Sequence, residues 1–344
     1  MSIEMTKAEV PGVPLLEVRD LHVEFHTRDG AAKAVNGVSY TVDAGETLAV
    51  LGESGSGKSV TAQTIMGILD MPPGRITGGE ILFRGEDMLK MSEEQRQRIR
   101  GDKIAMIFQD ALSALNPVLS VGFQLGEMFR VHRGASRREA KARAIELMDR
   151  VRIPAAKERV NDYPHQFSGG MRQRIMIAMA LALEPDVIIA DEPTTALDVT
   201  VQAQVMDLLA ELQRDFQMGL ILITHDLGVV ADVADKIAVM YAGRIVENAP
   251  VHELYKRPAH PYTKGLLESI PRLDHKGKDL YAIQGMPPSL TAIPKGCAFN
   301  PRCPMAQDVC RTDIPPLAEV LENDGGPIGG RSSACHFWKE TIHG

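Results

Sequence analysis

Residues 52–59 of this chain form a glycine-rich sequence of eight residues, GESGSGKS. It matches the phosphate-binding pattern G-x-x-x-x-G-K-[ST], follows the short apolar run 47–51 and precedes a segment with helical spacing at 59–69. A buried strand that feeds a glycine-rich turn and then a helix gathers backbone N–H groups and the helix dipole around one phosphate. The alternative is a glycine-rich turn without a ligand. The flanking strand and helix favour a nucleoside triphosphate site.

Lys58 and Ser59 end this loop, and each has a distinct expected role. The Lys58 ammonium is expected to reach the β- and γ-phosphates, and the Ser59 hydroxyl is expected to bind Mg²⁺. The glycines allow backbone N–H groups to curl around the β-phosphate. The residues expected to contact the nucleotide are Gly52, Ser54, Gly55, Ser56, Gly57, Lys58, Ser59 and Val60.

Two adjacent carboxylates, Asp191 and Glu192, follow a second apolar run at residues 187–190. Ligands of open α/β sheets bind at the carboxyl ends of the strands, so these acids are expected beside the phosphate loop. Asp191 is expected to hold Mg²⁺, directly or through water, and Glu192 is a candidate general base for an attacking water. The alternative, a solvated turn, would leave the phosphate loop without an acidic partner.

A third motif, FSGGMRQR at residues 167–174, precedes that strand. Ser168, Gly169 and Gly170 fall at the expected start of a helix, where a serine caps the first turn and N–H groups attract anions. This predicts a second anion-binding helix terminus. Residues 92–175 are also rich in charge and show helical spacing at 136–151, which indicates a helical insertion.

These motifs, followed by His225 at the end of a later strand-like run, resemble in their order the ATP-binding cassette (ABC) ATPases over residues 16–250. The resemblance implies an α/β fold with a P-loop NTPase core: a RecA-like mixed sheet, an antiparallel β edge and a helical subdomain at about 92–175. Past residue 250 the pattern weakens into a proline-rich stretch. We therefore expect an ATPase domain at 15–255 and a small cysteine-containing extension at 256–344.

The resemblance also implies roles for four further residues. Phe25, expected in the loop after the first strand, would stack on adenine, with a core phenylalanine as the alternative. Gln109, after a strand at 104–108, would contact Mg²⁺ and the attacking water and link the site to a membrane partner, with a solvated loop residue as the alternative. Asp198 lies in a segment, ALD, that would communicate between two ATPase subunits. His225 would sense the γ-phosphate, with an ordinary helix cap as the alternative.

Dimerisation is a further implication of the resemblance. In this family two subunits enclose two ATP molecules head to tail, so the Ser168 helix would close the nucleotide held by the other subunit's phosphate loop. Binding ATP would then stabilise the dimer, and hydrolysis would release it. The motif departs from the commoner Leu-Ser-Gly-Gly-Gln form at Phe167 and Met171. A catalytically silent subunit is a rival, against which Glu192 and His225 argue.

Residues 110–117, residues 257–264 and the downstream cysteines resemble the dipeptide and oligopeptide importer branch, and the phosphate loop its first ATPase subunit. The resemblance implies a second homologous ATPase subunit in a heterodimer and two transmembrane permease subunits. It also implies, indirectly, an extracytoplasmic substrate-binding protein. Nickel chelates and glutathione remain alternative cargoes. A cassette ATPase that acts on DNA, ribosomes or chromosomes remains a rival from another class.

Net charge and hydropathy narrow the possible partners and the expected location of the chain. The net charge is −7, and this acidic balance argues against a nucleic-acid partner. No run approaches the roughly 18 apolar residues of a membrane-spanning helix, and the first residues carry no apolar stretch of a secretory signal. We therefore expect a cytoplasmic chain, attached through permease subunits to the cytoplasmic face of the cell membrane.

The four cysteines gather in the last 48 residues. In a reducing compartment such a cluster indicates a metal more often than disulfides, and four thiolates suit either Zn²⁺ or a [4Fe-4S] cluster. The resemblance favours the iron-sulfur cluster, with zinc and no metal left open. Few periodic apolar runs occur past residue 271, so the tail is expected to need a metal to hold itself. The candidate ligands are Cys297, Cys303, Cys310 and Cys335.

Overall fold

The computed structural model describes residues 12–28, 30–110, 114–195, 197–270, 282–321 and 327–343. The strand that leads into the phosphate loop, β3, lies inside an eight-stranded sheet of order β11-β12-β10-β9-β3-β8-β7-β6. Pairing is parallel from β9 to β6 and antiparallel from β9 to β11, which confirms the expected mixed sheet. The strands are β3 (Thr47–Leu51), β6 (Ile104–Ile107), β7 (Val187–Asp191), β8 (Gly219–Thr224), β9 (Lys236–Tyr241), β10 (Arg244–Pro250), β11 (Ala318–Leu321) and β12 (Pro327–Ser333).

Parallel pairing brings the candidate site residues to one edge of this sheet. Strands β3, β7 and β8 are buried along their whole length, as continuous apolar runs require. Because neighbouring parallel strands end at the same edge, the chain leaves β3 into the phosphate loop, β7 into Glu192 and β8 into His225 side by side. Strand β6 pairs with β7 and ends just before Gln109.

A second sheet of order β2-β1-β4-β5 is antiparallel throughout, which confirms the expected antiparallel β edge. One apolar cluster joins it to the large sheet and to α1, and includes Val23, Val50 and Ile65. Phe25 requires a correction, because it lies within β1, between β2 and β4, and not in a loop. The strands are β1 (Leu16–Thr27), β2 (Gly30–Val42), β4 (Gly74–Phe83) and β5 (Glu86–Asp87).

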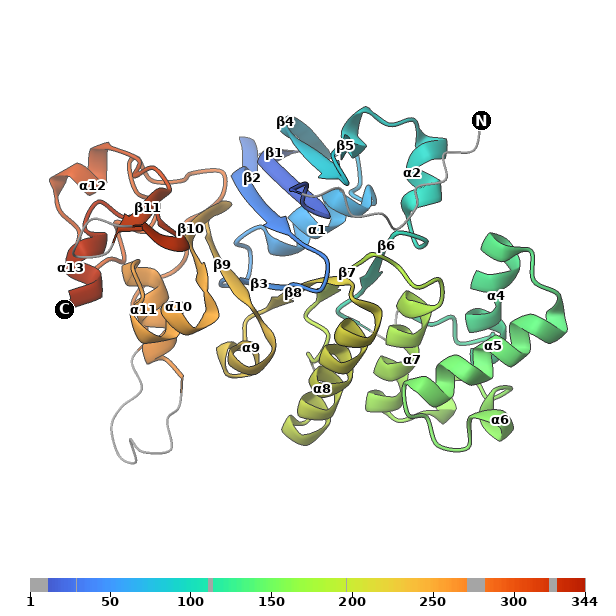
Figure 1. Cartoon of the computed structure of the whole chain (residues 1–344). Helices are drawn as coiled ribbons and strands as arrows, with labels where there is room; N and C mark the ends of the chain where they lie inside the picture. Colours follow the sequence, from blue (N-terminus) through green and yellow to red (C-terminus); the bar gives the residue numbers. More distant parts are fainter. Residues whose placement is uncertain are drawn as a thin grey trace.

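Several helices begin at capping side chains. Ser120, Ser136 and Ser168 accept hydrogen bonds from the first turns of α4, α5 and α7. Helices α4, α5 and α6 gather on one side of the molecule (Figure 1), while strand β6 of the large sheet also falls within residues 92–175. The helices are α1 (Lys58–Met66), α2 (Glu93–Ile99), α4 (Val121–Arg133), α5 (Arg137–Arg150), α6 (Ala156–Arg159), α7 (Gly169–Leu181), α8 (Val199–Phe216), α9 (Leu227–Val233), α10 (Val251–Lys256), α11 (Pro261–Glu268), α12 (Asp308–Thr312) and α13 (Trp338–His343), with short 3-10 turns η1 (Met88–Lys90) and η2 (Pro164–Gln166).

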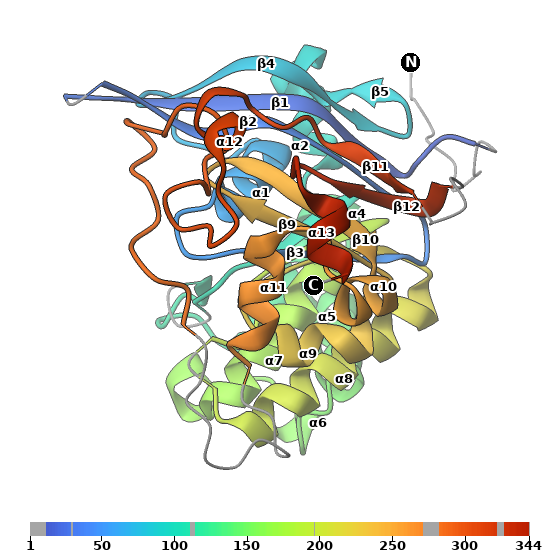
Figure 2. The same ribbon diagram turned by 90° about the vertical axis from the view of Figure 1, so that its left-hand side faces the viewer.

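The C-terminal extension shares the core of the large sheet. Strand β12 pairs with β10, opposite Glu247 and Asn248, and Figure 2 shows β11 and β12 running beside it. The ring of Phe299 lies 5.3 Å from that of Tyr241 and 5.4 Å from that of Tyr262. The tail therefore buries more apolar surface against the core of the large sheet than its sequence predicts. That it needs a metal to hold itself stays a prediction.

In the part of the chain that the structure describes, no helix is both long enough and apolar enough to cross a membrane. Three features singled out in the sequence fall partly outside the described residues. They are the first hairpin turn at Asp29, residues 111–113 of the segment 110–117, and Ala196 of the ALD segment.

Candidate functional site

Two glycines fix the turn between β3 and α1. The φ angle is +153° at Gly52 and +104° at Gly57, values that disfavour any side chain. A Cβ atom at Gly52 would lie 2.3 Å from the Met240 carbonyl oxygen, and one at Gly57 would lie 2.2 Å from the Ala34 carbonyl oxygen. Backbone on both sides therefore requires glycine at these positions. Of the other predicted contacts, Ser56 is buried, Ser59 and Val60 are half-buried, and Ser54 and Gly55 are exposed.

Lys58 is buried inside this loop. Its ammonium donates hydrogen bonds to the carbonyl oxygens of Gly52 at 2.8 Å and Glu53 at 3.0 Å. Burial lowers the pKa of Lys58, and the carboxylates of Glu192 and Asp191 oppose that shift. The cation is thus held at the N-terminus of α1, where both the helix dipole and the loop favour an anion.

Ser59 and Asp191 form the candidate Mg²⁺ site. The Ser59 hydroxyl donates to Asp191 Oδ1 at 3.1 Å, across the space between α1 and β7. Burial raises the pKa of Asp191, and the hydrogen bond from Ser59 opposes this shift. A hydroxyl oxygen beside a carboxylate oxygen offers the hard ligands that Mg²⁺ accepts, so these two residues fit the predicted ion.

Three side chains converge on the Glu192 carboxylate: Gln109 after β6, His225 after β8 and Thr195 from the turn of Glu192 itself. Gln109 Nε2 and Thr195 Oγ1 each donate to Glu192 Oε2 at 2.9 Å. His225 Nδ1 lies 3.5 Å from the same oxygen. Of the predicted catalytic residues, the structure therefore brings Gln109, Glu192 and His225 together at the sheet edge. A carboxylate oriented by hydrogen-bond donors has the arrangement that a general base requires.

The backbone of Glu192 is unusual for a residue with a side chain. Its φ angle is +47°, in the left-handed region that non-glycine residues rarely adopt. Its N–H donates to the Ile223 carbonyl oxygen of β8 at 2.8 Å, which holds this conformation at the end of β7.

Ser168 and Asp198 cap two neighbouring helices. The Ser168 hydroxyl accepts a hydrogen bond from the first turn of α7, and Asp198 Oδ1 accepts one from the Val201 N–H of α8 at 2.9 Å. A Cβ atom at Gly170 would lie 2.5 Å from Val201 Cγ1, so any side chain here would displace Val201 at the contact between the two helices. Ser168 and Gly169 are exposed, and they leave the helix terminus accessible to an anion.

The four cysteines line one cavity of the extension, together with His336 and Phe337. Burial raises the pKa of the Cys303 thiol to about 11 and that of Cys335 to about 12. Among the described residues, no group of three or more His, Cys, Asp or Glu side chains could hold a metal ion. The thiols of Cys297, Cys303, Cys310 and Cys335 therefore share a cavity, but their arrangement does not support the predicted cluster or zinc.

The contacts of the site that the sequence patterns do not predict include two hydrogen bonds. Thr195 bonds the Glu192 carboxylate, and its place three residues after that acid was a usable signal. The Tyr262 hydroxyl accepts a hydrogen bond from the Glu53 N–H at 2.9 Å. Tyr262 follows Glu53 by 209 residues, so no local pattern points to this contact.

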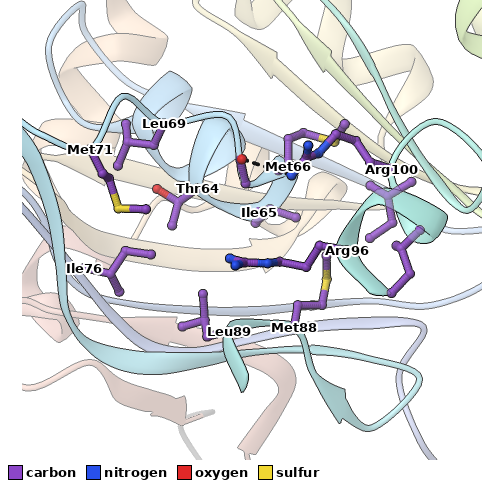
Figure 3. Close-up of a pocket in the computed structure, with 13 residues that line it drawn as sticks. Thr64, Ile65, Met66, Leu69, Met71, Ile76, Met88, Leu89, Arg96 and Arg100 are labelled. Atoms are coloured by element: carbon purple, nitrogen blue, oxygen red, sulfur yellow. Dashed lines mark hydrogen bonds between the residues drawn. The ribbon is translucent and has the colours of Figure 1, made fainter. Parts of the chain in front are cut away.

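A separate apolar pocket opens between α1, α2 and η1 (Figure 3). Arg96 reaches across it, and its Nε lies 3.3 Å from Glu93 Oε2. Arg100 at its margin donates to the Met66 carbonyl oxygen at 2.9 Å. None of the site residues predicted from the sequence lines this pocket, so it is distinct from the phosphate loop and its acids.

Comparison with known proteins gives a consistent result. Residues 35–195 match the family model "ABC transporter", and residues 246–310 match "Oligopeptide/dipeptide transporter, C-terminal region". The oligopeptide transport ATP-binding protein OppD of Salmonella typhimurium is 51% identical over 317 residues, which cover 92% of this chain and 94% of that protein. The dipeptide transport ATP-binding protein DppD of Bacillus subtilis is 53% identical over 314 residues, or 91% and 93% of the two chains.

Solved structures agree with the fold. The ATP-binding cassette MJ0796, described as a dimer in a post-hydrolysis state bound to ADP and Pi, superposes with a TM-score of 0.62 at 27% identity. The superposition covers 69% of this chain and 98% of that one. The predicted cassette fold is confirmed. The chain therefore belongs to the ABC ATPases, in the family that contains the oligopeptide and dipeptide transport ATP-binding proteins.

Proposed function

We propose that this chain is the ATP-hydrolysing subunit of a membrane importer of dipeptides and oligopeptides. The observation that carries the proposal is the convergence of Gln109, Thr195 and His225 on Glu192, at the sheet edge that also holds the Lys58 loop. A phosphate cradle, a cation site and an oriented carboxylate are what ATP hydrolysis requires. The peptide cargo is supported by the names of the OppD and DppD relatives and by the match of residues 246–310.

Loop 52–59 and Phe25 would bind the nucleotide. In the bound state Lys58 would exchange its contacts with loop carbonyl oxygens for the β- and γ-phosphates. Ser59 and Asp191 would hold Mg²⁺, which when bound supplies charge neutralisation at the phosphates. Phe25, partly buried in β1, would stack on adenine.

Glu192 would act as the general base. Its carboxylate would accept a proton from water as the water oxygen attacks the γ-phosphorus and the bond to the ADP oxygen breaks. Gln109 and Thr195 orient that carboxylate, and Gln109 would also contact the attacking water and Mg²⁺. His225, which lies 3.5 Å from Glu192, would respond to the γ-phosphate.

The complete site would lie between two ATPase subunits, a homologous pair in a heterodimer. The exposed Ser168 and Gly169 at the start of α7 would close over the ATP that the other subunit's phosphate loop holds. Asp198, at the start of the neighbouring helix α8, would communicate between the subunits. Support comes from MJ0796, which is described as a dimer bound to ADP and Pi.

The importer would include two transmembrane permease subunits, with an extracytoplasmic substrate-binding protein that delivers the peptide. This chain would sit at the cytoplasmic face of the cell membrane through contacts with the permeases. The transport function named for the OppD and DppD relatives supports this assembly.

The cysteine cavity keeps three candidate states: a [4Fe-4S] cluster, Zn²⁺ and free thiols. All four thiols line this one cavity, which is why the metal states stay candidates, but among the described residues they do not form a group that could hold a metal ion. Elemental analysis of anaerobically purified protein for iron, sulfide and zinc decides among the three. A colourless protein without these elements would eliminate both metal states.

Purification from detergent-solubilised membranes tests the proposed function. We expect a tagged chain to bring with it a related ATPase and two membrane-spanning proteins. In proteoliposomes supplied with the binding protein, dipeptides or oligopeptides should stimulate ATP hydrolysis, while nickel chelates and glutathione should not. Recovery of nucleic acid or ribosomes in place of membrane proteins would contradict the importer. Stimulation by nickel or glutathione alone would contradict the peptide cargo.

A further inference from the structure

The extension reaches the phosphate loop through one ion pair. Arg302 NH1 lies 2.6 Å from Glu53 Oε2, and Arg302 NH2 lies 3.0 Å from Glu53 Oε1. This is the bidentate arrangement in which a guanidinium holds a carboxylate most strongly. Glu53 is the second residue of the loop 52–59, whereas Arg302 lies 249 residues further along the chain.

Arg302 is fixed by its surroundings. Its side chain is 5% exposed. Besides Glu53, it donates to the Gln284 carbonyl oxygen at 3.1 Å and to the Tyr241 hydroxyl at 3.3 Å. The hydrogen bond to Glu53 raises the pKa of the guanidinium above its ordinary value. A buried arginine bonded on several sides is a rigid anchor for the carboxylate that it holds.

Glu53, which Arg302 holds in place, also contacts Lys58. The Glu53 carbonyl oxygen accepts a hydrogen bond from the Lys58 ammonium at 3.0 Å. The Glu53 N–H donates to the Tyr262 hydroxyl of α11 at 2.9 Å. Residues beyond position 256 therefore hold Glu53 at both its side chain and its backbone, next to the lysine that would meet the phosphates.

The ion pair with Arg302 also neutralises the negative charge of Glu53 in the loop. The Glu53 side chain is 28% exposed, and it belongs to the loop that would receive a triphosphate. An unpaired carboxylate at this position would repel the phosphates, since like charges at short range repel and partial burial weakens the screening. Arg302 cancels that charge.

Arg302 lies in the turn 297–303, which begins and ends at a cysteine. The Asn300 N–H donates to the Cys297 carbonyl oxygen at 3.0 Å, and the Arg302 N–H donates to the Phe299 carbonyl oxygen at 2.9 Å. Arg302 thus stands between two of the four cysteines, Cys297 and Cys303. The conformation of this turn sets where the guanidinium meets Glu53.

We infer that Arg302 is a positioning residue for ATP: through Glu53 it orients and neutralises the phosphate loop, so that the C-terminal extension sets the affinity for the triphosphate. The inference rests on the proposed binding of ATP by the Lys58 loop. Because the loop holds substrate and transition state alike, loss of the pair raises the KM for ATP and leaves kcat within about twofold of wild type.

Equilibrium binding of a fluorescent ATP analogue with Mg²⁺ to the purified full-length chain tests this inference. The R302Q variant removes the positive charge and the bidentate contact with Glu53. Its Kd for the ATP analogue should rise about tenfold. R302K keeps the charge without the bidentate geometry and should give an intermediate value. The matched control R311Q removes an exposed arginine of the same extension, paired with Asp308 at 2.7 Å, and should bind like wild type. A wild-type Kd for R302Q overturns the inference.

A double variant separates positioning from general support of the fold. In an E53Q background, R302Q should change the Kd less than about twofold, because its effect acts through Glu53. An equal loss of affinity in both backgrounds contradicts the inference. The wild-type chain provides a measurement that needs no variant: by reciprocal linkage, ATP should slow hydrogen exchange at residues 299–303. Unchanged exchange at those amides likewise counts against the inference.

The K58A variant separates this inference from the proposed function. If K58A binds the ATP analogue as tightly as wild type, the loop is not the nucleotide site and the proposed function fails. If K58A loses binding while R302Q keeps the wild-type Kd, only the role of Arg302 fails.

Discussion

At the residue scale, the Ser59 and Asp191 pair gives a prediction about Mg²⁺. Asp191→Asn keeps the size of the side chain and removes its charge, so the Mg²⁺ concentration for half-maximal nucleotide binding should rise about tenfold or more. A Mg²⁺ titration at fixed fluorescent ATP analogue measures this. Asp207→Asn, an exposed position on α8, is the matched control and should leave the titration unchanged. Equal Mg²⁺ dependence of the Asp191 variant and wild type would contradict the assignment.

Local pattern predicted which acids and which donors gather at the site, but not every contact between them. Gln109, Glu192 and His225 were expected at the ends of parallel strands, and strand order alone brings them together. Thr195 was missed because a hydroxyl after a strand-end acid is common in turns. The partner of Glu53 could not be predicted, since Arg302 carries no motif and contacts the loop only through the tertiary fold.

At the element scale, substitutions at two serine caps separate an effect on stability from an effect on ATP hydrolysis. Ser168 caps α7 and Ser136 caps α5, so Ser168→Ala and Ser136→Ala should each lower the free energy of unfolding by about 1 kcal/mol. Only the Ser168 variant should also lose ATP hydrolysis in the assembled transporter, by about tenfold, because only that helix end would close over nucleotide. Chemical denaturation and ATPase assays measure the two effects. Equal activity of both variants would contradict the closing role of Ser168.

Strands that consist of a continuous apolar run could be predicted from the sequence. Strands whose length depends on pairing with neighbouring strands were harder to predict. The runs at 47–51 and 219–224 coincide with β3 and β8, since fully buried parallel strands leave a plain apolar signal. The resemblance to the ABC ATPases implies that Phe25 lies in the loop after the first strand. Pairing on both sides of β1 extends that strand to Thr27.

At the scale of the whole molecule, a buried ion pair joins the extension to the large sheet. Arg331 has a side chain with no exposed surface, and its NH2 lies 3.4 Å from Glu247 Oε1. Burial raises the pKa of Glu247 to about 7, and the charge of Arg331 opposes this shift. Arg331→Met leaves Glu247 buried without its ionic partner, so it should lower the free energy of unfolding by about 1 to 3 kcal/mol. In the double variant Glu247→Gln replaces this acid with a neutral amide, and a substantial part of that loss should return. Denaturation of the full chain tests both, and no recovery in the double variant would contradict the ionic explanation.

The attachment of the extension was the least predictable part of the fold. Strand β12 contains Gly329 and Gly330 and shows no clear alternation of apolar and polar residues. Its partner β10 lies about 80 residues earlier in the chain, so no local pattern indicates their pairing. The sequence therefore indicates a tail with little core of its own. The aromatic contacts of Phe299 with Tyr241 and Tyr262 show that the tail packs on the core of the large sheet.

Single-turnover ATP hydrolysis by the assembled transporter tests the central claim most directly. Glu192→Gln removes the base and keeps a side chain of the same size that can still form hydrogen bonds. Hydrolysis of bound ATP should therefore slow at least about 100-fold, while the affinity for ATP should change little. Glu158→Gln, an exposed glutamate on α6, is the matched control and should hydrolyse ATP like wild type. Hydrolysis at the wild-type rate by the Glu192 variant would contradict the account.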